Sequence, residues 1–486
     1  MNILFLVPPI ELNPRKSWVD RVYGCTYGFD YKPPIHLLLL ATIARAAGHR
    51  VELLDCPGQG VGTKKLLRQV RTGPALDMVV FFTVWLSAAE DIGAAALLCR
   101  QQKQLSVVFT GPYPTWKPEL FLKGATYLVI RGEPEQAFRE IIDRGAGASV
   151  DWQGIPGVSC RDADVIRHGA GQAIADVERL PTPDRTLLRG TYIFNRLSAY
   201  PATVLCASRG CSFRCSFCAP HALDQAAEIE CLRQGGPKPP LRLRSAAQVI
   251  AEFQEIARLG YRGVEIIDNQ FVWDAERTMV ICEAIESLRL RWTCYARADY
   301  VQDPKLLAGM KAAGCALIFI GTDSFDQRIL DDTKKDIRLA DNYRAVRLVR
   351  ESGIEPEISL IFGASPLETP ATIRHSIREA RTCRTDFVHY SIAAPLPNTA
   401  LYRMAKENGY LRASEFAPLD NVRAGVLELP QVSGQFLQNM VRRCYREQYL
   451  SPRFIVKMLS SAHGYRLLAH YVKTMVRLLK FIWGIS

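Results

Sequence analysis

Three cysteines lie within one short stretch near the middle of the chain, at Cys211, Cys215 and Cys218, with the spacing C-x3-C-x2-C. A closed iron–sulfur site usually takes four thiolates, so three leave one iron of a cubane cluster without a protein ligand. An open position on a metal is where a substrate or a cofactor can bind. The flanking Arg209 and Arg214 favour the thiolate form of these cysteines. The stretch therefore predicts a catalytic iron–sulfur cluster.

The same cysteines allow two other interpretations. His221 follows Cys218 by three residues, so the three thiols and this imidazole could close a tetrahedral Cys3His zinc site. The cysteines could also pack as small apolar side chains in a core. The C-x3-C spacing is not the common zinc-knuckle pattern, which favours the cluster. A zinc-binding interaction module stays open as the non-enzymatic alternative.

The composition limits the class of protein. The chain has 486 residues, of which 48% are hydrophobic and 23% are charged, as in an ordinary globular protein of several domains. Its 14 cysteines are scattered, without the dense spacing of a secreted disulfide scaffold, which indicates a reducing compartment. No apolar run is long enough to span a membrane, and the N-terminus has no basic region of a signal peptide. We expect a cytoplasmic protein.

The net charge of +12 is concentrated at the C-terminus, where residues 441–486 hold nine Lys or Arg and one acid. A basic tail is not a binding surface for nucleic acid spread over the whole protein, so we expect no nucleic-acid partner. The pattern over Tyr465–Trp483 predicts a basic amphipathic helix. Such a helix can lie on an anionic membrane surface, which would make the protein membrane-peripheral. We favour docking on the protein's own core.

The cysteines need elements that position them, and the N-terminal region, roughly residues 1–145, alternates short apolar runs with helical patterns. Repeated βα units with apolar strands predict a parallel sheet covered on both faces, a doubly wound Rossmann-like or flavodoxin-like α/β domain. The expected strands are Ile3–Val7, Val51–Leu54, Met78–Phe82, Val107–Thr110 and Tyr127–Ile130, and the expected helices are Pro34–Ala47, Lys64–Val70, Ala88–Gln102 and Glu135–Ile142.

In such a sheet, ligands bind beyond the carboxyl ends of the strands. The residues at those ends include Thr83, Val84, Gly111, Pro112, Tyr113, Gly132 and Glu133. A G-x-G-x-x-G motif is missing after the first strand, which disfavours a dinucleotide.

We expect a linker over residues 146–199, because Gly145-Ala-Gly-Ala and the proline-rich Leu180–Arg185 are typical of flexible and extended chain. About six βα units then follow over residues 200–410 and predict an open, partial barrel with functional groups at the strand ends. Its expected strands are Thr203–Cys206, Gly263–Asp268, Trp292–Arg297, Ala316–Ile320, Ile358–Phe362 and Phe387–Ser391. Residues 411–486 form a basic helical region, with helices expected at Phe436–Tyr449 and Arg453–Leu459.

The cysteine spacing, Phe217 just before the last cysteine and Ser208-Arg209-Gly210 resemble the radical S-adenosylmethionine enzymes. The region before them resembles the cobalamin-binding domain of many members, in its order of elements and in the turns Gly111–Thr115 and Arg131–Glu133. The D-x-H-x-x-G motif, whose histidine ligates cobalt, is absent. The histidines of this region are His36 and His49, which we expect on a helix surface or at a helix end.

The resemblance reaches to about residue 410 and implies roles for residues at the strand ends. Glu265 and Asp268 would lie near the methionine part of S-adenosylmethionine. Arg297, Asp323 and Ser324 would contact its carboxylate, amino and ribose groups, although the family usually has Glu where Asp323 stands. Gly363 and Glu368 resemble a G-x-P-x-E-T-type turn. Phe217 would also lie by this cofactor, and the strand-end residues from Thr83 to Glu133 would line the cobalamin site.

The resemblance implies a cobalamin-dependent radical enzyme with a [4Fe–4S] cluster, S-adenosylmethionine and cobalamin. Such an enzyme generates a 5′-deoxyadenosyl radical and methylates an unactivated carbon of a small molecule, here a natural product, a tetrapyrrole or a lipid. Ring closure, rearrangement or oxidation without methyl transfer is the alternative within the class. A reductase, flavodoxin or ferredoxin would supply the electron.

Overall fold

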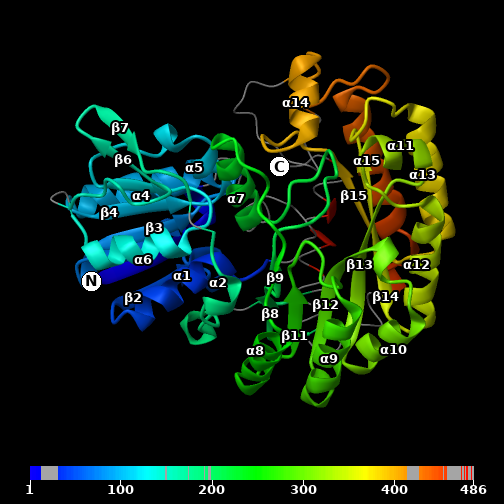
Figure 1. The fold of residues 1–486 in the computed structure, drawn as a ribbon, viewed down its shortest axis with the longest axis horizontal. Coiled ribbons are helices and arrows are strands. Elements are labelled where there is room, and N and C mark those ends of the chain that lie inside the picture. Colours follow the sequence, from blue (N-terminus) through cyan, green and yellow to red (C-terminus); the bar gives the residue numbers. More distant parts are fainter. Residues whose placement is uncertain are drawn as a thin grey trace. The chain divides into compact units, whose positions relative to one another are not determined.

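The structure is a computed structural model that divides into two compact units (Figure 1). The first contains the described residues up to Tyr192 together with Pro220–Arg242, and the second contains Ile193–Ala219 and the described residues from Leu243 onward. The structure describes residues 1–12, 31–147, 150–172, 174–190, 192–194, 197, 199–412, 426–452, 454–456, 472, 475–476, 478–479 and 483.

The first unit contains a sheet with the strand order β2-β1-β3-β4-β5-β6-β7. The first five of these are parallel neighbours, as the apolar runs predicted, and their order is that of a flavodoxin-like sheet. All five residues of β4 are buried, since helices cover both faces. These strands are β1 (Asn2–Val7), β2 (Arg50–Asp55), β3 (Met78–Phe82), β4 (Ser106–Thr110) and β5 (Tyr127–Ile130).

Helices of this unit pack in pairs, α1 with α6 and α3 with α4. The predicted helices are present, and their ends differ from the predicted ones by at most two residues. The helices are α1 (Ile35–Ala46), α2 (Cys56–Gln59), α3 (Thr63–Thr72), α4 (Ala88–Gln101), α5 (Pro112–Trp116), α6 (Glu135–Arg144) and α7 (Ala222–Arg233). The sequence did not predict α7, which comes from the stretch after the cysteines and packs against α5.

Two further strands extend the sheet of the first unit. β6 (Val158–Asp162) pairs antiparallel with β5, and β7 (Val165–His168) pairs antiparallel with β6. Within this hairpin β6 begins with three buried residues, whereas β7 is mostly exposed. The weak apolar pattern of an exposed edge strand explains why the sequence predicted only a linker over residues 146–199.

The second unit contains a six-stranded parallel sheet in the order β15-β14-β13-β12-β11-β8, so each strand lies beside its neighbour in the sequence. This is the predicted open barrel. Its strands are β8 (Ala202–Leu205), β11 (Gly263–Ile266), β12 (Arg291–Arg297), β13 (Cys315–Asp323), β14 (Glu355–Phe362) and β15 (Phe387–Ile392). The short β9 (Ser208–Arg209) and β10 (Arg242–Leu243) lie outside this sheet.

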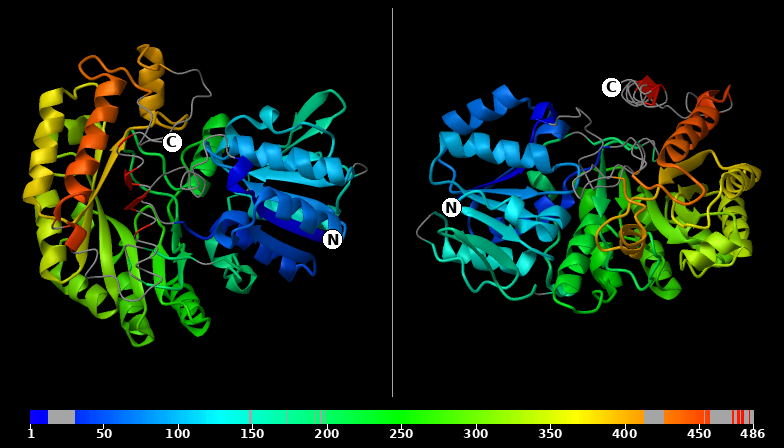
Figure 2. Two further views of the ribbon diagram at one scale, coloured as in Figure 1. Left: turned by 180° about the vertical axis from the view of Figure 1, so that it is seen from behind. Right: turned by 90° about the horizontal axis from the view of Figure 1, so that it is seen from above.

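Helices cover the outer face of this sheet and are coloured green to orange in Figures 1 and 2. Their apolar residues and the strands form one buried core. The helices of the second unit are α8 (Ala246–Arg258), α9 (Ala275–Ile285), α10 (Pro304–Ala312), α11 (Gln327–Asp332), α12 (Leu339–Glu351), α13 (Pro370–Thr382), α14 (Ala400–Glu407) and α15 (Gly434–Tyr449).

The two faces of the barrel strands differ in polarity. Val264 and Ile266 of β11 belong to the core, and Glu265 between them points to the other face. The same alternation places Thr293, Glu357, Ser359 and His389 on the inner face, where all are buried. Polar groups therefore line part of the barrel interior, beside Leu317 and Phe319 of β13 on the same face.

The C-terminal region is only partly described. α15 confirms the helix predicted over Phe436–Tyr449, whereas the helix predicted over Tyr465–Trp483 lies mostly outside the described residues. Of its described residues, Leu478 belongs to the core, Met475 packs against it, and Trp483 is exposed. No helix in the described part of the chain combines the length and the apolar character needed to cross a bilayer.

Candidate active site and cofactor-binding edges

The cysteine loop, residues 206–218, follows β8 at the carboxyl edge of the barrel. Backbone hydrogen bonds hold it at Ser216, between the last two cysteines: Ser216 N donates to Thr333 O over 2.8 Å, and Leu401 N donates to Ser216 O over 2.8 Å. Phe217 is half-buried and packs against the core of the second unit. The loop therefore presents its cysteines from a backbone fixed on two sides.

The three cysteines carry thiols, with Cys211 and Cys215 half-buried and Cys218 exposed. Among the described residues, no three His, Cys, Asp or Glu side chains are placed so that they could already hold a metal ion. The donor set nevertheless fits an open iron–sulfur site, because three thiols on one short loop can converge on a cluster. His221, the expected fourth ligand of a zinc site, has its Nδ1 3.2 Å from Nε2 of His36.

Asp268 fixes the entry into the cysteine loop. Its carboxylate accepts hydrogen bonds from Ala207 N (2.7 Å) and Ser208 Oγ (2.6 Å). Burial raises the pKa of Asp268 to about 7, although these hydrogen bonds oppose the shift. The neighbouring Asn269 donates to Gly210 O over 3.1 Å, at a glycine with a φ of 82°. The end of β11 thus shapes the backbone just before the first cysteine.

Glu265 and Gln270 belong to the same edge. Glu265 Oε1 accepts a 2.7 Å hydrogen bond from Tyr295 OH across neighbouring strands. Gln270 Oε1 accepts a 2.9 Å hydrogen bond from Arg297 N. Polar contacts thus run from the end of β11 to β12, as the alignment of strand ends predicted.

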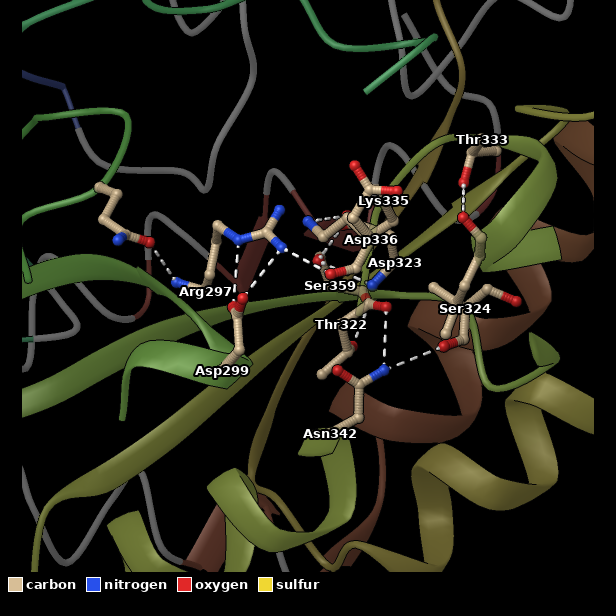
Figure 3. A network of polar contacts seen from close by, with 12 residues as sticks. Arg297, Asp299, Thr322, Asp323, Ser324, Thr333, Lys335, Asp336, Asn342 and Ser359 are labelled. Atoms are coloured by element: carbon tan, nitrogen blue, oxygen red, sulfur yellow. Dashed lines mark hydrogen bonds and ion pairs between the residues drawn. The ribbon is translucent and has the colours of Figure 1, made fainter. Parts of the chain in front are cut away.

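Arg297, the last residue of β12, lies against the cysteine loop. Its guanidinium is 3.5 Å from the ring centroid of Phe213 and makes two hydrogen bonds to Asp299, of 3.0 and 3.1 Å. The buried Nη1 atom has no hydrogen-bond partner within the described residues. A buried guanidinium donor without an acceptor is costly, so this position fits a ligand with a carboxylate or another acceptor group (Figure 3).

Asp323 and Ser324 follow one another but take part in different contacts (Figure 3). Asp323 accepts a 2.6 Å hydrogen bond from Ser359 Oγ and forms an ion pair with Lys335. The Ser324 hydroxyl lies 3.3 Å from that of Ser376 on α13, and its oxygen accepts a hydrogen bond from Asp326 N. Of these two, Asp323 lies among charged groups near Arg297, and Ser324 lies in a neutral network.

The turn predicted from Gly363 and Glu368 is present. The Glu368 carboxylate accepts hydrogen bonds from the backbone N–H groups of Gly363 (2.9 Å), Ala364 (2.8 Å) and Ser365 (3.2 Å). Burial raises the pKa of Glu368 to about 7 against these bonds. Ser365 Oγ donates to Asp332 over 2.6 Å, so the turn is tied to the residue just before Thr333.

The carboxyl edge of the sheet in the first unit contains unsatisfied polar groups. The hydroxyl oxygens of Thr83, after β3, and Thr110, at the end of β4, are buried and have no hydrogen-bond partner in the described part of the chain. Gly111 has a φ of 106°, and a Cβ there would lie 2.5 Å from Thr83 O. These two buried hydroxyls, beside a glycine that has no side chain, fit a ligand that supplies hydrogen-bond acceptors or donors.

Other predicted residues of this edge are engaged within the protein. Val84 N donates to Ser87 Oγ over 3.0 Å, and Tyr113 stacks on Trp85 with centroids 4.9 Å apart. Gly132 N donates to Thr115 Oγ1 over 3.0 Å, and Pro112 opens α5. The Glu133 carboxylate accepts hydrogen bonds from Arg242 and from Ala175 N. Glu133 and Arg242 thus form an ion pair at this edge.

The two histidines of residues 1–145 lie in different places. His49 Nδ1 is 3.2 Å from the N-terminal amine of Met1, before β1 begins. His36 is in the first turn of α1, at a helix end as predicted, but its side chain is buried. It lines a small pocket of about 30 Å³ with Val7, Phe82 and Asp91, because the N-terminus of α1 faces the carboxyl ends of β1 and β3.

Two side chains at the barrel edge were missed by the sequence prediction. Phe213 stacks on Trp273 and contacts Tyr300 edge-on, and the guanidinium of Arg297 makes a cation–π contact with its ring. Its place between the first two cysteines was a signal that could have been used. Lys335 stands in a charged run typical of a solvated turn, and only the structure places it in a buried ion pair.

Comparisons with known proteins agree with both halves of this architecture. Residues 205–399 match the model of the radical SAM superfamily, and residues 21–142 match that of the B12 binding domain. The chain is 26% identical over 472 residues to an uncharacterized methyltransferase of Pyrococcus horikoshii, covering 96% of each chain. It is also 26% identical over 311 residues to an anaerobic magnesium-protoporphyrin IX monomethyl ester cyclase of Rubrivivax gelatinosus, covering 61% of this chain and 52% of the cyclase.

The fold is similar to that of OxsB, a cobalamin-dependent S-adenosylmethionine radical enzyme solved with aqua-cobalamin and S-adenosylmethionine. The TM-score is 0.70 at 16% identity, over 99% of this chain and 71% of OxsB.

The barrel, the cysteine loop and the matched models together define an enzyme of the radical S-adenosylmethionine class. Within that class, the chain belongs to the family whose members carry a B12-binding domain. The cofactors of this family are a [4Fe–4S] cluster, S-adenosylmethionine and cobalamin, as the sequence predicted. Membership of an enzyme family contradicts the alternative of a zinc-binding interaction module.

Proposed function

We propose that the protein is a cobalamin-dependent radical enzyme that methylates an unactivated carbon of a small molecule. Cys211, Cys215 and Cys218 would hold the cluster. Phe217, Glu265, Asp268, Arg297, Asp323, Ser324 and Gly363 would surround S-adenosylmethionine. Thr83, Val84, Gly111, Pro112, Tyr113, Gly132 and Glu133 would form the cobalamin edge.

When bound, the cluster and S-adenosylmethionine supply a radical that takes hydrogen from carbon, and cobalamin supplies the methyl group. The chain's own residues bind and orient these groups. The buried Nη1 of Arg297 would donate to the cofactor carboxylate, while Asp299 holds the guanidinium in place. Asp268 would act on the backbone of the cysteine loop through Ala207 and Ser208. The polar inner face of the barrel would take the substrate.

The likeness to a protein named as a methyltransferase carries this proposal, because it extends over 96% of both chains and so includes both compact units. The buried threonine hydroxyls at the carboxyl edge of the first unit support a ligand there. A natural product, a tetrapyrrole and a lipid are the substrate classes that we propose. Comparing metabolites of a deletion strain with those of its parent would select among them.

Anaerobic purification in the presence of cobalamin tests the cofactor set. We expect brown protein with iron and sulfide, an electron paramagnetic resonance signal that S-adenosylmethionine perturbs, and corrinoid that survives a desalting column. A Cys215→Ala variant should lose the iron and keep the corrinoid. If wild-type protein keeps its iron and loses the corrinoid, methyl transfer is contradicted and radical chemistry without cobalamin replaces it.

The second candidate function is ring formation, rearrangement or oxidation without methyl transfer. The likeness to a protein named as a cyclase favours it, over a shorter stretch. The two functions differ in stoichiometry, because a transferred methyl group must come from S-adenosylmethionine. Methylation should yield S-adenosylhomocysteine together with 5′-deoxyadenosine, whereas ring formation should yield 5′-deoxyadenosine alone.

We propose two partners besides the substrate. A reductase, flavodoxin or ferredoxin would supply the electron. The C-terminal segment would stay docked on the core through Leu478 and contact an anionic membrane surface through Val472, Val476 and Trp483, which are exposed in a basic stretch. Sedimentation with vesicles tests this contact. Binding to anionic but not to neutral vesicles is expected, and a Trp483→Ser variant should bind more weakly.

A further inference from the structure

A buried ion pair lies beside the cysteine loop. Lys335 and Asp323 have side chains that are only 9% and 10% exposed. The other carboxylate oxygen of Asp323 accepts a 2.6 Å hydrogen bond from Ser359 Oγ. A Cβ at Gly321 would lie 3.1 Å from Lys335 Nζ, so this glycine leaves room for the ammonium.

The loop that carries Lys335 is fixed to the cysteine loop. Thr333 O accepts a 2.8 Å hydrogen bond from Ser216 N, and Asp336 O accepts one of 3.2 Å from Nη2 of Arg297. Lys334 and Asp336 have φ values of 51° and 52°. Positive φ values at both neighbours of Lys335 are unfavourable for residues with a side chain and persist only where the surroundings impose them. The backbone is thus constrained to direct Lys335 inward.

The charge of Lys335 also interacts with the cysteine loop. Burial acts to lower the pKa of Lys335, but the charges of Asp323 and Cys215 outweigh it and raise that pKa. The hydrogen bond from Ser216 N to Thr333 O holds the loop of the buried Lys335–Asp323 pair beside the residue that follows Cys215. In a buried setting an interaction between charges is much stronger than in water.

We infer that Lys335 is a positioning residue whose buried ammonium stabilises negative charge on the iron–sulfur site at Cys215, with Asp323 as the opposing charge that limits this effect. The inference rests on the proposed function. Net charge and burial set the reduction potential of a cluster. A fixed positive charge favours the reduced, more negative state, so the pair sets how readily this cluster accepts its electron.

Two substitutions of opposite sign test this inference in the cluster-loaded full chain without S-adenosylmethionine. Lys335→Met removes the positive charge at similar size and should lower the equilibrium constant for one-electron reduction about tenfold, a shift of about 59 mV to more negative potential. Asp323→Asn removes the negative charge and should shift the potential in the opposite direction, since Asn tolerates the positive φ of 57° at this residue. The exposed neighbour Lys334→Met is the matched control and should leave the potential unchanged.

Redox titration followed by electron paramagnetic resonance gives the readout, with iron content measured on each sample. Shifts of the same sign in both variants, or none in either, would overturn the inference, because a purely structural role predicts no opposition of sign. If Lys335→Met binds no iron, Asp323→Asn decides alone: a shift to more positive potential supports the inference and no shift refutes it. Wild-type protein that binds no cluster would contradict the proposed function as well.

Discussion

At the scale of single residues, two buried carboxyl groups hold the backbone of the barrel edge. Asp268 accepts from the segment before the cysteines, and Glu368 accepts from the turn after β14. Both have a pKa raised to about 7 by burial. Each therefore keeps its proton to a much higher pH in the folded chain than in the unfolded chain.

This shift has a defined sign for stability. Between the ordinary pKa of a carboxyl and about 7, the folded state binds more protons than the unfolded state, so stability falls as the pH rises. The contribution is complete below pH 4 and lost by about pH 7. We expect the apparent Tm of Asp268→Asn to fall less than that of wild type between about pH 5 and pH 8. Equal slopes in the two proteins would contradict a raised pKa at Asp268.

A second prediction at the scale of single residues concerns Arg297. Lys would retain the charge but lose the paired hydrogen bonds to Asp299 and the flat contact with Phe213. We expect Arg297→Lys to weaken S-adenosylmethionine binding about tenfold while iron content stays unchanged, a loss of about 1.4 kcal/mol. Equilibrium dialysis measures it. Arg291→Lys, at the other end of β12, is the control. An equal loss of S-adenosylmethionine binding in this variant would contradict the assignment of Arg297 to the cofactor site.

At the scale of elements, the close approach of β3 and β4 depends on Gly111. Its φ of 106° is strained for any L side chain, and an added Cβ would meet Thr83 O at 2.5 Å. We expect Gly111→Ala to lower the free energy of unfolding by about 2 kcal/mol or more and to weaken corrinoid retention. Gly93→Ala, in an open position on α4, should instead stabilise by about 0.5–1 kcal/mol. Denaturant unfolding compares the two.

Elements with strong apolar patterns were predictable, and others were not. β3 and β5 begin and end where the sequence placed them, because buried parallel strands consist of apolar residues throughout. α7 was missed because it is buried nearly all round, so its apolar and polar residues show no stripe. Ser324 shows the limit at the site itself: its position in the strand end was predictable, but its partner Ser376 comes from a distant helix.

At the scale of the whole molecule, the two compact units contain separate apolar cores. A ligand that binds one folded unit stabilises that unit by mass action. We expect calorimetry to resolve two unfolding transitions. Added cobalamin should raise the Tm of only one of them, the transition in which the first unit loses its parallel sheet. The Cys215→Ala variant should keep that response. A single transition whose Tm rises both with cobalamin and with S-adenosylmethionine would refute separate unfolding of the two units.

The alternation of polar and apolar residues along the barrel strands has a consequence for how this kind of enzyme diversifies. Thr293, Glu357 and His389 face inward, whereas neighbouring residues of the same strands face the helices and belong to the core. Inward positions can therefore exchange during evolution without creating cavities beneath the helices. A lineage can acquire new substrates one strand at a time while its scaffold stays the same.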